Sequence, residues 1–336
     1  MINFRELSQT WVVAEIGVNH EGDVDVAADL IEKAAAAGAD AVKFQTFQIE
    51  HYISTVQPER RARTARFQLS GEDFARLRKL ADQCGVVFFS TPFDWRDADF
   101  LDGISPIFKV SSGDLTHLNL VRHVAAKGKP IILSTGLGTP EEISAAVAAV
   151  QDGQPGAGER GNLMLMHCIA AYPAPAEEAN LRNIGWLAEE FGLPIGYSDH
   201  TLGTKACELA VAAGASALEK HFTFRKEDQT FHDHAISADP ADLADLVSAV
   251  RRAETYLGNW DRRRSPAEQN NLVNMRRSLG AAVDIPAGEP IRDDWVTFLR
   301  PAQGLGPENF SGLIGKQLNR TVRAGDLILS EDVEDS

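Results

Sequence analysis

Two lysines lie inside apolar stretches of the sequence, where an unpaired charge is costly. Lys43 and Lys109 are each flanked by apolar residues, and a buried ammonium group needs a carboxylate or a bound anion beside it. Hydroxyl-bearing residues run into glycine at 111–113 and 134–136. Such turns offer hydroxyls and backbone N–H groups that suit a phosphate. The pattern predicts a pocket for a small phosphorylated anion; separate residues on a solvated rim are the alternative.

Two histidines close two successive apolar stretches. His200 and His221 would lie at the ends of adjacent strands, about 4.8 Å apart, so that both imidazoles could reach one ion. Two histidines with open positions suit a divalent metal acting as a Lewis acid. Two independent rim histidines are the alternative interpretation. His232 and His234, in the loop that follows, are considered as further ligands.

The elements that must position these residues alternate regularly. Eight apolar, β-branched stretches predict strands at 11–18, 41–47, 86–92, 107–113, 131–136, 163–170, 194–200 and 217–223. Helical patterns lie near 25–37, 72–83, 94–102, 117–127, 140–150, 180–191, 203–213 and 240–257. Strict alternation implies parallel pairing, and strands without apolar–polar alternation are covered on both faces. Eight such units in about 250 residues predict a closed (β/α)8 barrel. The alternative, an open doubly wound sheet, would need a GxGxxG turn after the first strand, which is lacking.

In such a barrel the active site lies at the C-terminal ends of the strands. Polar residues gather at these ends: Glu15, Asn19, His20, Lys43, Gln45, Ser90, Thr91, Lys109, Ser111, Ser112, Asp114, Ser134, Thr135, His167, Cys168, Tyr172, Ser198, Asp199, His200, Glu219, Lys220 and His221. We expect them to line one site.

The pattern changes after about residue 258. We expect a barrel domain over 1–257, a linker over 258–276 and a small, turn-rich second domain over 277–336. A domain of this size is near the lower limit for independent stability. It is therefore expected to gain stability by packing against the barrel or against a partner subunit.

Composition excludes several classes of protein. The 336 residues include 48 acidic and 33 basic ones, a net charge of −15, which argues against nucleic-acid binding. No apolar stretch is long enough for a membrane span, and the N-terminus has no signal-peptide pattern. The three cysteines, Cys84, Cys168 and Cys207, form no CxxC pair and predict a reducing, cytoplasmic compartment. A nucleophilic role for Cys168 would need a base beside it.

At these residues the chain resembles the sialic acid synthase family, which condenses phosphoenolpyruvate with an amino-sugar aldehyde. The matching motifs occur in order along nearly the whole barrel, at 14–20, 42–46, 90–93, 109–114, 132–136, 167–168, 172–173, 198–201 and 219–223. Residues 276–279, 285–289, 300–301 and 313–316 are similar to the family's C-terminal domain, which resembles type III antifreeze protein. The resemblance thus implies an α/β chain, a TIM barrel followed by a small β-rich antifreeze-like (SAF) domain.

The resemblance also implies a role for each matching residue. His200 and His221 would hold Mn²⁺ or Mg²⁺. Phosphoenolpyruvate would be bound, chiefly at its phosphate, by Lys109, Ser112, Ser134 and Ser198. The residues implied to line the reacting carbons are Glu15, Lys43 and Thr91. Those implied to meet the sugar are Gln45, Asp114, Tyr172 and Asp233, with Arg300 supplied by the exchanged C-terminal domain of the other subunit in a homodimer.

The implied reaction makes the chain a transferase of nonulosonate and polysaccharide biosynthesis. The enol carbon of phosphoenolpyruvate attacks the aldehyde, water adds at the carbon that bears phosphate, and phosphate leaves by C–O cleavage. The metal would act as the Lewis acid. Glu15 is the residue expected to handle the proton of the attacking water.

Three differences from the family's pattern bear on which sugar the chain uses more than on the reaction that it catalyses. Ala170 stands where some members have an asparagine that reaches the phosphate. The stretch 48–70, with arginines at 60, 61, 63 and 66, is either a solvated basic segment or a lid that selects the sugar. Residues 300–304 read RPAQG in place of the more usual RPGNG.

Three functions stay open. The acceptor is N-acetylmannosamine or a relative in the first. In the second it is a 6-deoxy diacetamido sugar, as for legionaminic, pseudaminic or spore-coat-type nonulosonates. The third is a non-catalytic sugar- or surface-binding module, against which the full set of charged strand-end residues argues.

Overall fold

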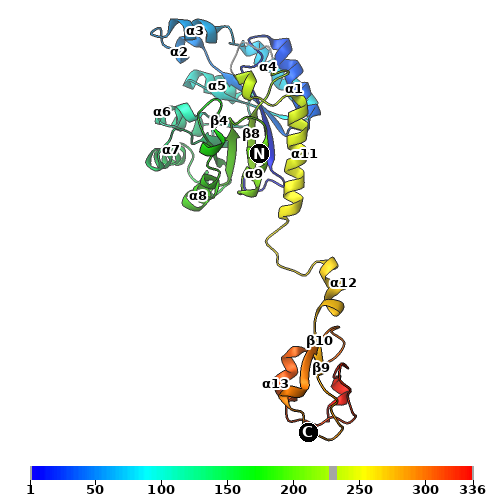
Figure 1. Cartoon of the computed structure of the whole chain (residues 1–336). Helices are drawn as coiled ribbons and strands as arrows, with labels where there is room; N and C mark the ends of the chain where they lie inside the picture. The colour runs from blue at the N-terminus through cyan, green and yellow to red at the C-terminus, as the bar shows by residue number, and fades with distance from the viewer. Residues whose placement is uncertain (1, 227–232, 335–336) are drawn as a thin grey trace. The chain divides into compact units, whose positions relative to one another are not determined.

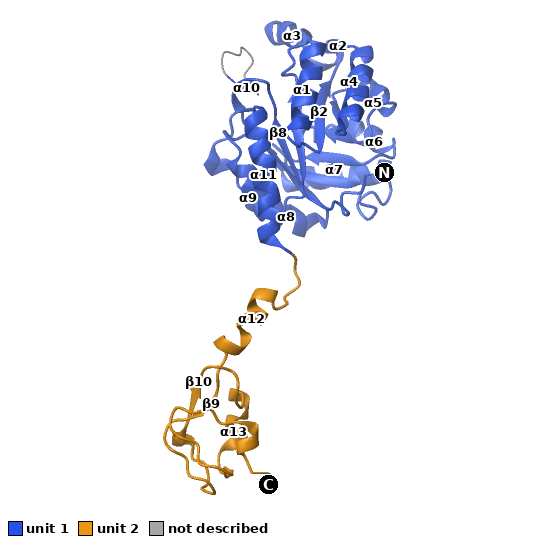
Figure 2. Ribbon diagram, turned by 90° about the vertical axis from the view of Figure 1, so that its right-hand side faces the viewer, with its two compact units in different colours: residues 1–258 blue, residues 259–336 orange. Residues whose placement is uncertain are grey.

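The computed structural model describes residues 2–226 and 233–334. The chain forms two compact units, Met1–Gly258 and Asn259–Ser336, called here the barrel unit and the tail unit (Figure 2). Each unit has its own apolar core.

The barrel unit is a closed parallel barrel whose strands follow the order of the sequence. Figure 1 shows these strands with helices around them. The strands are β1 (Trp11–Gly17), β2 (Ala41–Thr46), β3 (Val87–Pro92), β4 (Phe108–Val110), β5 (Ile131–Ser134), β6 (Leu163–Cys168), β7 (Ile195–Asp199) and β8 (Ala217–His221). Pairing of β8 with β1, from Trp11 opposite Ala217 to Glu15 opposite His221, closes the ring. The predicted (β/α)8 fold is confirmed.

Helices follow the strands and cover the outside of the barrel. They are α1 (Val24–Ala36), α4 (Gly71–Cys84), α5 (Trp95–Asp102), α6 (Leu118–Ala125), α7 (Pro140–Gly153), α8 (Arg182–Phe191), α9 (Lys205–Ala212) and α11 (Pro240–Leu257). Thr139 and Glu142 form a capping box at the start of α7, with Pro140 in its first turn, so the local sequence dictates where this helix begins. No helix in the described ranges is both long enough and apolar enough to cross a membrane.

Short elements occupy the loops at the C-terminal ends of the strands. The loop after β2 contains α2 (Ile49–Tyr52) and α3 (Pro58–Ala65), which the hydrophobic pattern did not predict because α3 buries no residue. The loop after β8 contains α10 (Asp233–Ile236), and 3-10 turns η1 (Ser112–Asp114) and η2 (Ala176–Glu178) follow β4 and β6.

The interior of the barrel changes from apolar to polar along the strands. Its N-terminal part is filled by Phe4, Val13, Ala41, Phe89, Ile107, Ile132, Met164, Met166 and Ala217. Because side chains alternate along a strand, the residue two positions further on faces the same interior. Val13 is thus followed by Glu15, Ala41 by Lys43, and Ile107 by Lys109. The apolar layer forms a floor beneath a ring of polar side chains.

The tail unit is small and rich in turns, as predicted. Its regular elements are α12 (Pro266–Met275), β9 (Ser278–Ala281), η3 (Asp293–Trp295), β10 (Val296–Leu299), η4 (Pro307–Asn309), α13 (Phe310–Leu313) and η5 (Ser330–Asp332). β9 and β10 pair antiparallel, and nine buried apolar residues, among them Leu279 and Ile328, form the core. The stretch 258–276, expected as a linker, contains α12, which starts at a Ser265–Glu268 capping box.

Candidate active site

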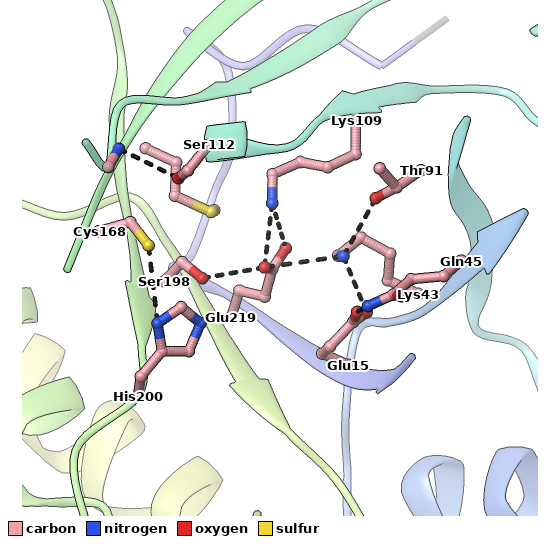
Figure 3. A network of polar contacts seen from close by, with 12 residues as sticks. Glu15, Lys43, Gln45, Thr91, Lys109, Ser112, Cys168, Ser198, His200 and Glu219 are labelled. Atoms are coloured by element: carbon pink, nitrogen blue, oxygen red, sulfur yellow. Dashed lines mark hydrogen bonds and ion pairs between the residues drawn. The ribbon is translucent and has the colours of Figure 1, made fainter. Parts of the chain in front are cut away.

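A buried carboxylate, Glu219 on β8, binds both lysines of the barrel interior (Figure 3). Nζ of Lys109 lies 3.0 Å from both of its oxygens, and Nζ of Lys43 lies 3.8 Å from Oε1. Lys43 also lies 2.9 Å from Oε2 of Glu15, and Ser198 Oγ donates to Glu219 at 3.0 Å. The lysines therefore have the counter-charges that the sequence required.

The carboxyl groups of Glu219 and Glu15 have pKa values that are shifted in opposite directions. Burial opposes the charged form of Glu219, but Lys109 and Lys43 outweigh it and lower its pKa to about 2. Burial, with the charge of Glu219, raises the pKa of Glu15 even though Lys43 opposes the shift. Two carboxyl groups whose pKa values are pushed apart can take different roles. Glu219 is a fixed anion, and Glu15 is suited to exchanging a proton.

Hydroxyl groups complete the wall of a cavity of about 450 Å³, called here the inner cavity. Ser134 Oγ is buried and has no hydrogen-bond partner among the residues that the structure describes. Ser112 Oγ accepts from the Gly136 N–H at 3.1 Å, and a Cβ at Gly136 would lie only 2.7 Å from this oxygen. The remaining hydroxyls and ammonium groups that line this cavity include those of Thr91, Lys43, Lys109, Ser111 and Ser198. The donor set suits an anion such as a phosphate.

His200 and His221 stand side by side at the edge of the inner cavity. Their ring centroids are 5.4 Å apart. Nδ1 of His200 donates to the Ile169 carbonyl at 2.7 Å, which leaves Nε2 as an acceptor. Burial lowers the pKa of both imidazoles, so both are neutral, as metal binding requires.

Two observations fit a divalent cation at this pair. Nδ1 of His221 is buried without a hydrogen bond to any described residue. Asp233 Oδ2 lies 3.9 Å from that nitrogen. Within residues 2–226 and 233–334, no group of three or more His, Cys, Asp and Glu side chains is placed to hold a metal ion.

His234, one of the two further histidines considered as ligands, bonds to other residues than this pair. Nδ1 of His234 lies 2.7 Å from Thr223 Oγ1, and its Nε2 lies 3.3 Å from Glu21. His232 lies outside the described residues.

Four residues that the resemblance implies to contact the sugar line one or both of two adjoining cavities. Gln45 Nε2 is 3.3 Å from Glu15, and the Tyr172 ring lies over His200 with centroids 4.0 Å apart. Asp114 accepts from Ser111 Oγ at 2.6 Å, and burial raises its pKa. Burial and the charge of Glu15 raise the pKa of Asp233 to about 7. Gln45, Tyr172 and Asp233 also line a second cavity of about 230 Å³, called here the outer cavity. Arg300 follows β10 in the tail unit.

Sequence reasoning placed Glu219 among the strand-end residues but assigned it no role. A signal was present, because Glu219 lies two residues before His221 and so faces the same side of the strand. Cys168 lies 3.8 Å from His200, and burial raises the pKa of its thiol, so it is not an activated nucleophile. The methyl group of Ala170 lines the inner cavity.

Comparisons with known proteins agree with this architecture. The sequence profile of the NeuB family matches residues 30–262, and that of the SAF domain matches residues 276–334. The N,N'-diacetyllegionaminic acid synthase of Legionella pneumophila is 37% identical over 96% of this chain and 94% of that protein. The N-acetylneuraminate-9-phosphate synthase of Mus musculus is 32% identical over 96% and 92%. The crystal structure of the N-acetylneuraminic acid synthetase of Leptospira borgpetersenii superposes with a TM-score of 0.74, at 33% identity, over 79% of this chain and 90% of that one.

Proposed function

Since the chain belongs to the NeuB family, we propose that it condenses phosphoenolpyruvate with an N-acetylated amino-sugar aldehyde to give a nonulosonic acid and phosphate. One observation carries the proposal. A carboxylate-balanced lysine pair, built from Glu219, Lys43 and Lys109, lies in the same cavity as two neutral imidazoles. Such a cavity offers an anion-binding end next to an electrophile-activating end.

The phosphate of phosphoenolpyruvate is assigned to the inner cavity. Glu219 lies between both ammonium groups before the substrate arrives, and a dianionic phosphate would then share the lysines with it. The Oγ of Ser134, which has no hydrogen-bond partner among the described residues, would supply hydrogen bonds to phosphate oxygens together with Ser112 and Ser198. Thr91, in contact with Lys43 at 3.3 Å, lines the wall beside the reacting carbons.

The bond changes of the reaction balance without a further reagent. A carbon–carbon bond forms between the enol carbon and the aldehyde carbon, the aldehyde oxygen becomes a hydroxyl, and water adds at the carbon that bears phosphate. The C–O bond to phosphate then breaks. Glu15, whose pKa burial raises, would take the proton of the water. A Mn²⁺ or Mg²⁺ ion bound by His200 and His221 would supply Lewis-acid stabilisation of the aldehyde oxygen.

Metal binding can be tested without turnover. Replacing His200 or His221 with alanine removes one of two protein ligands, so affinity for Mn²⁺, measured by calorimetry or electron paramagnetic resonance, should fall at least about 100-fold. His123→Ala, on α6 and paired with Asp99, is the matched control and should bind as the unaltered chain does. Unchanged Mn²⁺ affinity in both cavity variants would remove the metal from the proposal.

The acceptor sugar is decided by a substrate panel. Purified protein is supplied with phosphoenolpyruvate, Mn²⁺ and each aldose, and phosphate release and product mass are measured. N-acetylmannosamine is the first acceptor proposed. A 6-deoxy diacetamido sugar is the second, favoured by the 37% identity to the Legionella enzyme. Turnover with that sugar alone would replace the first acceptor by the second, and no phosphate release with any aldose would refute the synthase function.

We also propose a homodimer in which the tail unit of one subunit brings Arg300 to the sugar of the other. The small size of the tail core supports it, since such units gain stability from a partner. Mixing an Arg300→Ala variant with a His221→Ala variant tests the exchange, because mixed dimers regain one intact site. Sedimentation of the full chain and of a chain ending at residue 258 tests the dimer; two monomers would contradict it. A cytoplasmic location is proposed from the three free cysteines.

A further inference from the structure

A leucine holds a backbone conformation that normally favours glycine. Leu137 has a φ of +64° at the third position of the turn that follows β5, where the Gly138 N–H donates to the Thr135 carbonyl at 3.2 Å. Glycine or asparagine is preferred at such a position, because any other side chain crowds the following carbonyl oxygen. Two other non-glycine residues in the described ranges have a positive φ, Glu21 and Asn180, and neither is aliphatic.

The residues on both sides of Leu137 hold this turn in place. The Gly136 N–H donates to Ser112 Oγ at 3.1 Å, and a Cβ at Gly136 would lie only 2.7 Å from that oxygen. A Cβ at Gly138 would lie 2.3 Å from Cδ2 of Leu115. The close packing leaves the backbone little room to shift, so the strain at the leucine is not relieved by movement of the turn.

The side chain of Leu137 gains little from packing that could offset this strain. It is 77% exposed, yet it lines the inner cavity, so it stands at the opening of that cavity. Ser112 and Ser134, whose hydroxyls the proposed function assigns to phosphate oxygens, line the same cavity. Strained residues of this kind concentrate at ligand-binding sites. The strain therefore points to a ligand at the end of the cavity where these serines lie.

We propose that Leu137 is a binding residue for phosphoenolpyruvate, which its side chain covers at the opening of the inner cavity. The inference rests on the proposed function and adds to it a residue that makes neither a charge contact nor a hydrogen bond. An apolar cover excludes water, and the attraction of Lys43 and Lys109 for a phosphate is stronger where water is excluded. Because the turn already fixes the backbone of Leu137, less ordering is needed when the substrate binds.

Leu137→Gly tests the inference, because it relieves the backbone strain and removes the covering side chain. The urea midpoint of unfolding should stay the same or rise, since the lost side chain is exposed and glycine adopts a positive φ freely. The dissociation constant for phosphoenolpyruvate, measured by calorimetry without an acceptor sugar, should nevertheless rise about 10-fold. A merely structural role would instead lower stability and affinity together.

Three further variants isolate the side chain. Leu137→Ala keeps the restricted backbone and should weaken binding as Leu137→Gly does, which separates the missing cover from added flexibility. Leu137→Met restores an apolar side chain and should bind nearly as the unaltered chain does. Leu209→Ala removes an exposed leucine side chain from α9 and is the matched control, because Leu209 is not among the described residues that line the inner cavity.

The outcomes separate this inference from the proposed function. Equal affinity for phosphoenolpyruvate in the unaltered chain and in Leu137→Gly would overturn the inference and leave the function standing. The inference would also be overturned if Leu137→Met bound as weakly as Leu137→Gly, or if Leu209→Ala lost as much affinity. An unaltered chain that does not bind phosphoenolpyruvate at all would refute the function itself, and the inference with it.

Discussion

The carboxylate of Asp199 lies 2.8 Å from Nζ of Lys220, and each residue directly precedes one of the paired histidines, His200 and His221. The two are register partners across β7 and β8, and both side chains are fully buried. Lys220 also donates to the Thr201 carbonyl at 2.6 Å, and Asp199 accepts from the Thr201 N–H at 2.9 Å. This ion pair therefore ties together the strand ends that present the two imidazoles.

Replacing Lys220 with methionine should be strongly destabilising, because it leaves the Asp199 carboxylate buried without its cation. We expect the free energy of unfolding in urea to fall by about 3–5 kcal/mol. Lys205→Met breaks the exposed pair with Glu208 and should cost no more than about 1 kcal/mol. Equal losses in the two variants would show that the buried pair does not hold the strand ends.

Replacing Glu219 with glutamine should make the protein depend on anions for stability. Lys43 and Lys109 would lose the carboxylate between them, so without a bound anion the variant should unfold at a lower temperature than the unaltered chain. Inorganic phosphate should then stabilise this variant more than the unaltered chain, by the linkage between ligand binding and folding. Thermal unfolding with increasing phosphate measures the effect, and Glu208→Gln on α9 is the exposed control. The same response to phosphate in the unaltered chain and Glu219→Gln would contradict the assignment of the inner cavity.

His20 should make stability depend on pH on the acid side. Burial lowers the pKa of its imidazole from 6.5 to about 4. Between these values the unfolded chain binds a proton that the folded chain excludes, so stability falls as the pH drops from 6.5 towards 4. The loss should reach about 3 kcal/mol.

Comparison with His20→Gln isolates this residue, because other buried histidines titrate in both proteins. As the pH is lowered from 7 to 4.5, the unaltered chain should lose more unfolding free energy than His20→Gln does. A constant difference over that range would show that His20 does not keep a lowered pKa in the folded chain.

Ala170 should limit the affinity for phosphoenolpyruvate. Its methyl group lines the inner cavity, where an asparagine would add an amide donor. Ala170→Asn is expected to lower KM for phosphoenolpyruvate by about 5-fold or more, the effect of one added hydrogen bond to a charged group. Ala171→Asn, one residue further on, is the control. A raised KM in Ala170→Asn alone would mean that the cavity has no room for the amide.

The succession of strands and the identity of the residues at their ends could be predicted from the sequence. Local apolar patterns and glycine positions set where elements begin and end, and the alternation of side chains places Glu15 above Val13 and Lys43 above Ala41 inside the barrel. The pairing of His200 with His221 follows from the adjacency of consecutive strands. The short helices α2 and α3 escaped prediction because an element that buries little apolar surface leaves little periodic signal.

Tertiary structure alone decided which charges meet. Glu219 contacts Lys109, 110 residues earlier in the chain, because closure of β8 onto β1 brings strands from opposite parts of the sequence around one interior. Arg60 and Arg63 line a cavity while Arg61 supports a helix, although all three occupy one polar stretch. Local sequence sets backbone conformation, whereas contacts across a closed barrel depend on how all eight strands pack together.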